Sequence, residues 1–169
     1  MDITRIIQKK RDGEALDSVE ISAVIDGFVS GEVPEYQVAA LAMAIYFQGM
    51  DESETSALTR ALMDSGESLD WAGVEGARVD KHSTGGQGDK VSLVLAPLVA
   101  SCGLQVPMVA GRGLGPTGGT IDKLESIPGY RTGLAAAEIR RITEEVGCVI
   151  ASQGGDFAPA DGRLYALRD

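Results

Sequence analysis

The sequence predicts an α/β protein, with a small N-terminal helical domain followed by the start of a parallel-sheet α/β domain. Residues 1–66 contain four helix-forming segments, each bounded by capping residues or glycine. From about Trp71 onward, short β-branched segments, glycine loops and helices alternate. Repeated strand, loop and helix order is typical of a parallel sheet covered by helices.

The first two helices are marked by residues that start and end helices. The segment "DITRIIQKKRDG" is predicted to begin at Asp2 and to end at Gly13. The segment "DSVEISAVIDGFVSG" opens with Asp17 and Glu20 in the spacing of a capping box, in which each side chain accepts a backbone N–H of the first turn.

The third and fourth helices follow the same logic. The segment "PEYQVAALAMAIYFQGM" is predicted to begin with a first-turn proline, Pro34, and to end near Gly49. The segment "DESETSALTRALMDSG" opens with a second capping box, Asp51 and Glu54, and is expected to stop at Gly66.

In the second half, "ARVDK", "QVPMVAG" and "CVIASQ" predict strands, and "KVSLVLAPLVASCG", "TIDKLESI" and "AAAEIRRITEEVG" predict helices. A last helix is expected to be capped by Asp161 and to end in "LYALRD". Two glycine loops, 81–90 and 111–120, lie where strands pass into helices. Because α/β proteins bind ligands at such positions, we expect a ligand site there.

Composition excludes several functions. The chain has 169 residues and 44% hydrophobic residues, with no apolar run near the roughly 18 residues of a membrane span and no signal-peptide pattern, so we expect a cytoplasmic globular protein. The formal charge of −10 disfavours nucleic acid and acidic membranes as partners. Cys102 and Cys148 lack metal-ligand spacing and lie among apolar residues, which predicts buried thiols and no metal site.

The two glycine loops have the composition of a phosphate site. Glycines allow positive φ and a close approach of the backbone to a ligand, and N–H groups at the following helix start favour an anion. The glycines expected to form these loop backbones are Gly85, Gly86, Gly88, Gly113 and Gly115. The P-loop pattern is absent, and Pro116 together with the lack of a following acidic residue weakens a dinucleotide reading of the G-x-G-x-x-G in the second loop.

Polar side chains beside the first loop fit the same ligand. Lys81 offers a positive charge to phosphate, and Ser83, Thr84 and Ser92 offer hydroxyl groups. His82, the chain's single histidine, either contacts a ligand carbonyl or shuttles a proton, or else ties the loop to neighbouring backbone.

The predicted last helix carries a second candidate pair. Tyr165 and Arg168 stand about one turn apart on it. Arg168 either binds the carbonyl edge of a planar ligand or pairs with a surface carboxylate such as Asp169.

Three motifs in this chain resemble those of the thymidine and pyrimidine-nucleoside phosphorylase family. The family patterns are approximately K-H-S-T-G-G-x-G-D, S-G-R-G-L-G-H-T-G-G-T-x-D-K-L-E-x-I-P-G and D-x-x-P-A-D-x-x-L-Y-A-L-R-D. This chain matches them at 81–89, 111–129 and 156–169, and the similarity extends over "QVAALAMAIYFQGMDESETSALTRAL". The resemblance therefore spans nearly the whole chain.

The resemblance implies reversible phosphorolysis of a pyrimidine nucleoside to free base and pentose 1-phosphate. Inorganic phosphate is then the co-substrate, with no other cofactor. The implied phosphate ligands are Lys81, Ser83, Ser92 and Thr120. The implied base contacts are His82, Tyr165 and Arg168. Among these, His82 and Arg168 are the implied catalytic residues, because they would stabilise negative charge on the leaving base.

The resemblance also implies a domain plan. Residues 1–66 would form the helical domain for the base and for dimerisation, residues 71–153 the first part of the phosphate-binding α/β domain, and residues 154–169 a segment returning to the helical domain. Cleft closure would bring the substrates together. Family members are usually homodimers through their helical part, so we expect a homodimer.

The chain departs from the family in four ways. The family continues beyond "LYALRD", into a segment with further base-binding residues, which predicts an N-terminal fragment. Ala110 replaces a serine and Pro116 replaces a histidine. Lys90 stands where a smaller residue is common: it adds charge near the phosphate, displaces a monovalent cation that some relatives bind near Gly88, or is a solvated lysine at the helix start.

Two rival functions stay open. Anthranilate phosphoribosyltransferase-like enzymes share the plan of a helical domain, an α/β domain and a glycine-rich anion loop. A non-catalytic module that binds phosphate or nucleoside is the other alternative. The motifs "KHSTGG" and "LYALRD" favour the phosphorylase.

Overall fold

The computed structural model describes residues 2–83, 89–113, 117–153 and 157–167. The described residues form two compact units. One is helical and comprises residues 2–68 and 157–167, and the other comprises residues 69–153 and contains the sheet. The predicted fold class, a helical domain followed by an α/β domain, is confirmed.

The helical unit consists of helices whose starts follow the predicted capping residues. Its elements are α1 (Ile3–Arg11), α2 (Ser18–Ser30), α3 (Glu35–Gln48), α4 (Glu52–Asp64) and α8 (Pro159–Leu167). Both capping boxes are formed, with Asp17 and Glu20 at the start of α2 and Asp51 and Glu54 at the start of α4. Each box supplies acceptors for N–H groups that have no partner within the helix.

Two predicted helix starts were wrong, by one residue for α3 and by three residues for α8. Pro34 is the N-cap of α3 and precedes the first helical residue, with an extended ψ of 154°. Asp161 lies inside the first turn of α8, which begins at Pro159. A proline is well suited to a first helical position because it has no N–H to leave unpaired, so α8 starts at the proline and Asp161 faces the positive end of the helix dipole.

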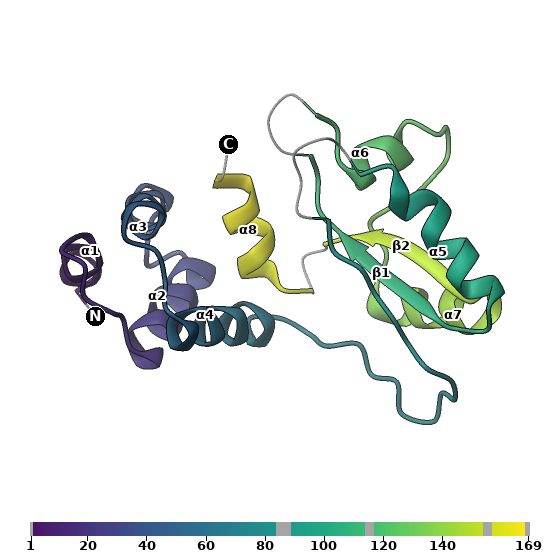
Figure 1. Cartoon of the computed structure of the whole chain (residues 1–169), viewed down its shortest axis with the longest axis horizontal. Helices are drawn as coiled ribbons and strands as arrows, with labels where there is room; N and C mark the ends of the chain where they lie inside the picture. The colour runs from purple at the N-terminus through teal and green to yellow at the C-terminus, as the bar shows by residue number, and fades with distance from the viewer. Residues whose placement is uncertain (1, 84–88, 114–116, 154–156, 168–169) are drawn as a thin grey trace. The chain divides into compact units, whose positions relative to one another are not determined.

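Pairs of helices enclose the core of this unit. Helix α1 packs against α3, and α2 packs against α4 (Figure 1). The buried cluster comprises Ile6, Leu16, Ile21, Val24 and Leu41. Helix α8 packs against α2, α3 and α4, so a segment distant in sequence completes the helical unit.

The second unit is built on two parallel strands. Its elements are α5 (Val91–Ser101), β1 (Val106–Ala110), α6 (Thr120–Glu125), α7 (Ala136–Val146) and β2 (Cys148–Ser152). The strands pair in register from Val106 opposite Cys148 to Ala110 opposite Ser152. Parallel neighbours require a crossover, which here contains α6 and α7.

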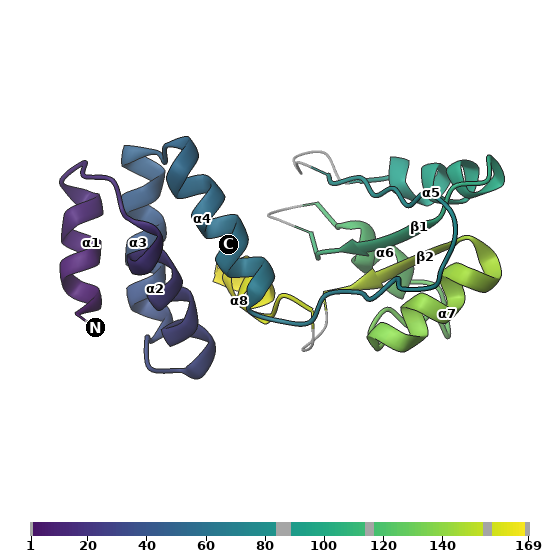
Figure 2. The same cartoon turned by 90° about the horizontal axis from the view of Figure 1, so that it is seen from below.

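Helices cover both faces of the strand pair. Alternate residues of β1, namely Val106, Met108 and Ala110, join a buried cluster with Ala96 of α5 and Ile121 of α6. Helix α7 packs against both strands, and Figure 2 shows it on the side opposite α5. Because side chains alternate between the faces of a strand, the sheet is buried on both sides.

The predicted strand "ARVDK" was wrong. Residues 77–81 form only an isolated parallel bridge, in which Arg78 pairs with Gln105. The bridge is fixed by hydrogen bonds from Val79 N to Gln105 O and from Gln105 N to Ala77 O, both 2.9 Å long. Because Gln105 directly precedes β1, the bridge holds the segment that carries Lys81 next to the start of this strand.

The thiols were predicted to be buried, and this was wrong for Cys102, which is exposed at the end of α5. Cys148 is half-buried in the first position of β2.

In the described part of the chain, none of the helices combines the length and the apolar character that crossing a membrane would demand.

Candidate functional site

Three side chains that the sequence predicted as phosphate ligands meet in the second unit. Lys81 lies in the segment after the bridge, Ser92 in the first turn of α5, and Thr120 at the first residue of α6. Ser92 and Thr120 each occupy a place where irregular backbone passes into a helix. The residue that joins them is Asp89, which directly precedes Lys90, the N-cap of α5.

The Asp89 carboxylate accepts hydrogen bonds from all three. Its Oδ1 atom lies 2.8 Å from Lys81 Nζ and 3.2 Å from the backbone N of Ser92. Its Oδ2 atom accepts the Thr120 hydroxyl at 2.7 Å and also accepts the Ser92 hydroxyl. One carboxylate therefore ties together a lysine and the starts of two helices.

The carboxylate and the two hydroxyls of this cluster are shielded from solvent, while the Lys81 side chain is 29% exposed. Ser92 is 1% exposed and Thr120 is 4% exposed, while the Asp89 side chain is 6% exposed. Burial alone would raise the pKa of Asp89, but the hydrogen bonds from Lys81, Ser92 and Thr120 outweigh it and lower the pKa far below its ordinary value. Asp89 is therefore ionised and neutralises the charge of Lys81.

The second loop is held by another carboxylate. Asp122, in the first turn of α6, accepts the N–H groups of Gly113 at 2.6 Å and Gly119 at 2.8 Å. Its other oxygen lies 3.1 Å from Arg112 Nη1. The N–H of Gly113 lowers the pKa of Asp122, and the N–H of Gly119 and the Arg112 guanidinium add to this against the effect of burial.

Gly113 and Gly119 are required in this loop because their backbones nearly touch. A Cβ on Gly113 would lie 2.4 Å from the backbone N of Gly119 and 2.3 Å from the carbonyl oxygen of Thr117. Neither glycine has a positive φ, so the predicted use of positive φ was wrong for these two positions. The backbone of this loop approaches itself closely at these two glycines, and the predicted close approach to a ligand stays a prediction.

A cavity of about 160 Å³ adjoins the cluster. Asp80, Lys81 and Ser92 line its polar side, and the rest of the lining is apolar: Val79, Leu95, Ala96, Val99, Val106 and Met108. Charges attract each other more strongly beside apolar atoms than in water, because the surroundings screen them less. An anion in this cavity would therefore be attracted to Lys81 more strongly than in open water.

The other predicted site residues lie as follows. His82 is exposed and Ser83 is half-buried, in the segment that follows Lys81. Tyr165 is half-buried on α8, in the helical unit. Lys90 is exposed at the N-cap of α5, and Ala110 is the buried last residue of β1. The residues that fall outside the described part are Thr84, Gly85, Gly86, Gly88, Gly115, Pro116 and Arg168.

Sequence reasoning missed Asp89. The motif "KHSTGGQGDK" contains it, but no role was assigned to it. Its place just before an apolar helical segment is that of a helix-capping residue, and this signal could have drawn attention to it. Its contact with Thr120, 31 residues away, could not be inferred from local sequence.

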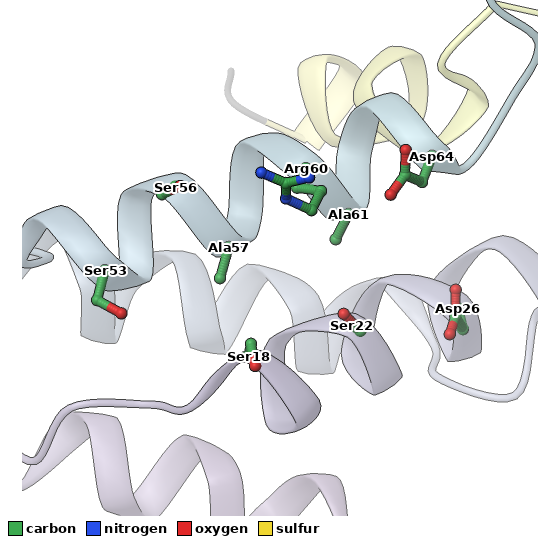
Figure 3. Close-up of a pocket in the computed structure, with 9 residues that line it drawn as sticks. All are labelled: Ser18, Ser22, Asp26, Ser53, Ser56, Ala57, Arg60, Ala61 and Asp64. Atoms are coloured by element: carbon green, nitrogen blue, oxygen red, sulfur yellow. The ribbon is translucent and has the colours of Figure 1, made fainter.

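A second concave surface lies on the helical unit. Figure 3 shows side chains of α2 and α4 along an open groove of about 550 Å³. It is lined by Ser18, Ser22, Asp26, Ser53, Ser56, Ala57, Arg60, Ala61 and Asp64. None of the predicted site residues lines it.

Within the described residues, no group of three or more His, Cys, Asp or Glu side chains is arranged to hold a metal ion.

Both units match known family models. Residues 4–66 match the glycosyl transferase family, helical bundle domain, and residues 75–169 match the glycosyl transferase family, a/b domain. The second match covers more than half of the chain and includes Lys81, Asp89, Ser92 and Thr120.

Curated relatives extend the comparison. The thymidine phosphorylase of Rhizobium meliloti (strain 1021) is 59% identical over 164 residues, which are 97% of this chain and 37% of the relative. The pyrimidine-nucleoside phosphorylase of Geobacillus stearothermophilus is 51% identical over 169 residues, which are 100% of this chain and 39% of the relative. The chain thus spans well under half the length of these relatives.

A solved structure shares the fold. The crystal structure of anthranilate phosphoribosyltransferase from Thermus thermophilus matches with a TM-score of 0.70 at 23% identity, over 99% of this chain and 50% of that chain. At this identity the match establishes the fold alone.

Proposed function

This chain belongs to the glycosyl transferase family, and we propose that it forms part of a pyrimidine-nucleoside phosphorylase that acts on thymidine, uridine or both. The relatives named thymidine phosphorylase and pyrimidine-nucleoside phosphorylase, at 59% and 51% identity, support this assignment. The reaction would transfer the pentose from the pyrimidine to inorganic phosphate.

One observation carries the proposal: Lys81, Ser92 and Thr120 converge on a single anionic group. Their donors lie within 2.8 Å of the Asp89 carboxylate, apart from the backbone N–H of Ser92 at 3.2 Å. A half-buried ammonium group and two buried hydroxyls within reach of one anion are the donors that a phosphate needs. We assign them, with Ser83, as the phosphate site.

The proposed chemistry needs few groups. A phosphate oxygen forms a bond to the anomeric carbon of the pentose as the bond to the pyrimidine nitrogen breaks, and the base leaves with the electron pair. The phosphate, held by Lys81, stabilises the positive charge that develops on the sugar. His82, whose side chain is exposed to an incoming ligand, and Arg168 would stabilise the negative charge on the base, with Tyr165 contacting the base.

Inorganic phosphate is the co-substrate in this proposal, and no further cofactor is assigned. We place the protein in the cytoplasm. The free cysteines Cys102 and Cys148 fit a reducing compartment.

We also propose a homodimer through the helical unit. Helix α3 exposes large side chains that a monomer would normally cover: Tyr36, Met43, Tyr46 and Phe47 are between 52% and 78% exposed. Tyr36, Met43 and Phe47 are spaced by seven and four residues, so they lie along one face of the helix. A symmetric pairing of this face would remove the apolar surface from water.

The proposal is tested by phosphate-dependent release of thymine from thymidine and of uracil from uridine. The assay uses this chain and a chimera in which it replaces the matching 169 residues of the Geobacillus stearothermophilus pyrimidine-nucleoside phosphorylase. We expect base release by the chimera that requires phosphate, and loss of release in Lys81→Ala and His82→Ala. The charge control is Arg141→Ala, on the exposed surface of α7, which should retain activity.

Three outcomes would contradict the proposal. Base release without phosphate would indicate a hydrolase. Consumption of phosphoribosyl pyrophosphate without base release from nucleosides would indicate a phosphoribosyltransferase. Phosphate binding by a folded chimera that lacks both activities would indicate a binding module.

A further inference from the structure

The donors of the proposed phosphate site are already engaged by an anion that belongs to the chain. Asp89 Oδ1 accepts Lys81 Nζ and the Ser92 N–H, and Asp89 Oδ2 accepts the Ser92 and Thr120 hydroxyls. An ionised carboxylate offers about four lone-pair sites. These four hydrogen bonds therefore use the full accepting capacity of the Asp89 side chain.

The two hydroxyls cannot serve two anions at once. Each hydroxyl has a single hydrogen to donate, and in this structure the hydrogens of Ser92 and Thr120 are directed to Asp89. A phosphate bound by the same hydroxyls must take these hydrogen bonds from Asp89. Lys81 has three N–H donors, so it can bind Asp89 and phosphate together.

We infer that Asp89 is an internal competitor for phosphate, whose carboxylate holds Lys81, Ser92 and Thr120 in place and gives up their hydrogen bonds when phosphate binds. This inference rests on the phosphate site of the proposed function. It makes Asp89 a positioning residue that also weakens anion binding.

The charged groups around the site also weaken the binding of an anion. Asp89 neutralises Lys81, so an incoming phosphate meets an ion pair without net charge. A second carboxylate lies near: Asp80 accepts the backbone N–H of Lys81 at 2.7 Å. The other charged neighbour in the described part of the loop is Lys90, which is exposed. Removing the charge of Asp89 would leave Lys81 uncompensated and favour any anion.

This competition has a use in a reversible reaction. While the site holds no phosphate, Asp89 satisfies buried donors that would otherwise lack a partner. When phosphate is bound, the nearby carboxylate opposes it and speeds its release. The site is thus kept assembled without holding its anion tightly.

The test is the dissociation constant of phosphate and of sulfate, measured by calorimetry on the 169-residue chain and on Asp89→Asn. Asparagine keeps the shape and an oxygen that can accept the Ser92 N–H, but it removes the charge. We expect Asp89→Asn to bind both anions more tightly, by roughly tenfold, because a like charge is removed from beside the ligand. A merely structural role for Asp89 predicts weaker binding.

Two further variants keep the result decisive. Asp89→Ser removes the charge and retains a side-chain oxygen that can accept a backbone N–H of the first turn of α5, so it replaces Asp89→Asn if that variant does not fold. Asp80→Asn removes a charge near Lys81 without freeing the Ser92 and Thr120 hydroxyls, and we expect it to tighten binding much less than Asp89→Asn does. Equal effects of the two would overturn the inference, since charge alone would then explain them.

The remaining outcomes separate the inference from the proposed function. If the unsubstituted chain binds phosphate, Lys81→Ala abolishes binding, and Asp89→Asn binds no more tightly, the phosphate site stands and the competitor role is overturned. A further outcome is that sulfate binds more tightly to Asp89→Asn while phosphate binds more weakly. This result would mean that Asp89 accepts a hydrogen bond from the P–OH group of phosphate, which sulfate lacks, and the competitor role would again be overturned. If neither chain binds either anion, both the site and the inference fall.

Discussion

The ammonium group of Lys10 lies 2.7 Å from one carboxylate oxygen of Glu54 and 2.8 Å from the other. Both side chains are almost completely buried, at 4% and 2% exposure. Glu54 also accepts the N–H of Leu16 at 2.8 Å and the N–H of Asp51 at 3.0 Å. Glu54, the second member of the capping box of α4, is thus also the anion of a buried ion pair that joins α1 to α4.

Lys10→Met should destabilise the helical unit strongly. The substitution leaves the Glu54 carboxylate buried without its cation, which costs about 3–5 kcal/mol in comparable cases. The free energy of unfolding in urea measures the effect. Lys9→Met is the matched control, because Lys9 pairs with Glu20 near the surface and its loss should be hardly measurable. Equal losses in the two variants would show that the buried pair contributes no more than the exposed one.

Acid should destabilise the fold. Burial raises the pKa of Glu54, but hydrogen bonds from Leu16, Lys10 and Asp51 outweigh it and lower the pKa below its ordinary value of 4.5. A lowered pKa contributes stability above the ordinary value, and that stability is lost as the pH falls toward the folded-state pKa, because the unfolded chain binds the proton first. Asp89 and Asp122 act in the same sense.

The measurement is the free energy of unfolding between about pH 7 and about pH 3. We expect little change down to about pH 5 and a steady loss below about pH 4.5. Asp122→Asn should show a shallower loss than the unsubstituted chain does. Stability that rises on acidification would contradict the assignment of these carboxylates as ionised.

Gly113→Ala should destabilise the second loop. The new Cβ would meet backbone atoms of Thr117 and Gly119 at 2.3 and 2.4 Å, and backbone cannot move aside as a flexible side chain can. We expect a loss of about 1–3 kcal/mol, as for overpacked positions. Thermal unfolding measures it. Gly118→Ala is the control, since its Cβ would meet only Asp122 Cβ at 3.8 Å, an ordinary contact. A neutral Gly113→Ala would mean that the loop relaxes freely.

Arg163→Ala should loosen α8 from α2. Arg163 Nη1 donates to the carbonyl oxygens of Phe28 at 2.7 Å and Val29 at 3.0 Å, at the end of α2, and its guanidinium lies 4.9 Å from the Phe28 ring centre. Losing these contacts should cost about 1–2 kcal/mol. Hydrogen exchange of α8 amides reports the effect directly. Arg141→Ala, which breaks an exposed pair with Glu145, should change stability by less than about 0.5 kcal/mol. Unaltered exchange in α8 would show that other contacts hold this helix.

Helix starts were predictable because they depend on neighbours in sequence. Asp17 with Glu20 and Asp51 with Glu54 form the capping boxes that their three-residue spacing predicts. The expected strands at 105–111 and 148–153 were also found, as β1 and β2. The segment 77–81 was also predicted as a strand but forms a single bridge, because strand formation depends on pairing and packing with distant residues as well as on local sequence.

By itself, the sequence determined the fold class, most of the places where helices begin, and the two glycine loops beside which Lys81, Ser92 and Thr120 lie, since these depend on local pattern and on motif. Only the tertiary structure decided that Asp89 joins these three side chains and that Glu54 pairs with Lys10 across 44 residues. Both carboxylates sit at helix starts, where local rules explain their presence. Their partners come from distant segments, and burial makes those contacts obligatory: an ionised group removed from water must find hydrogen bonds wherever the fold supplies them.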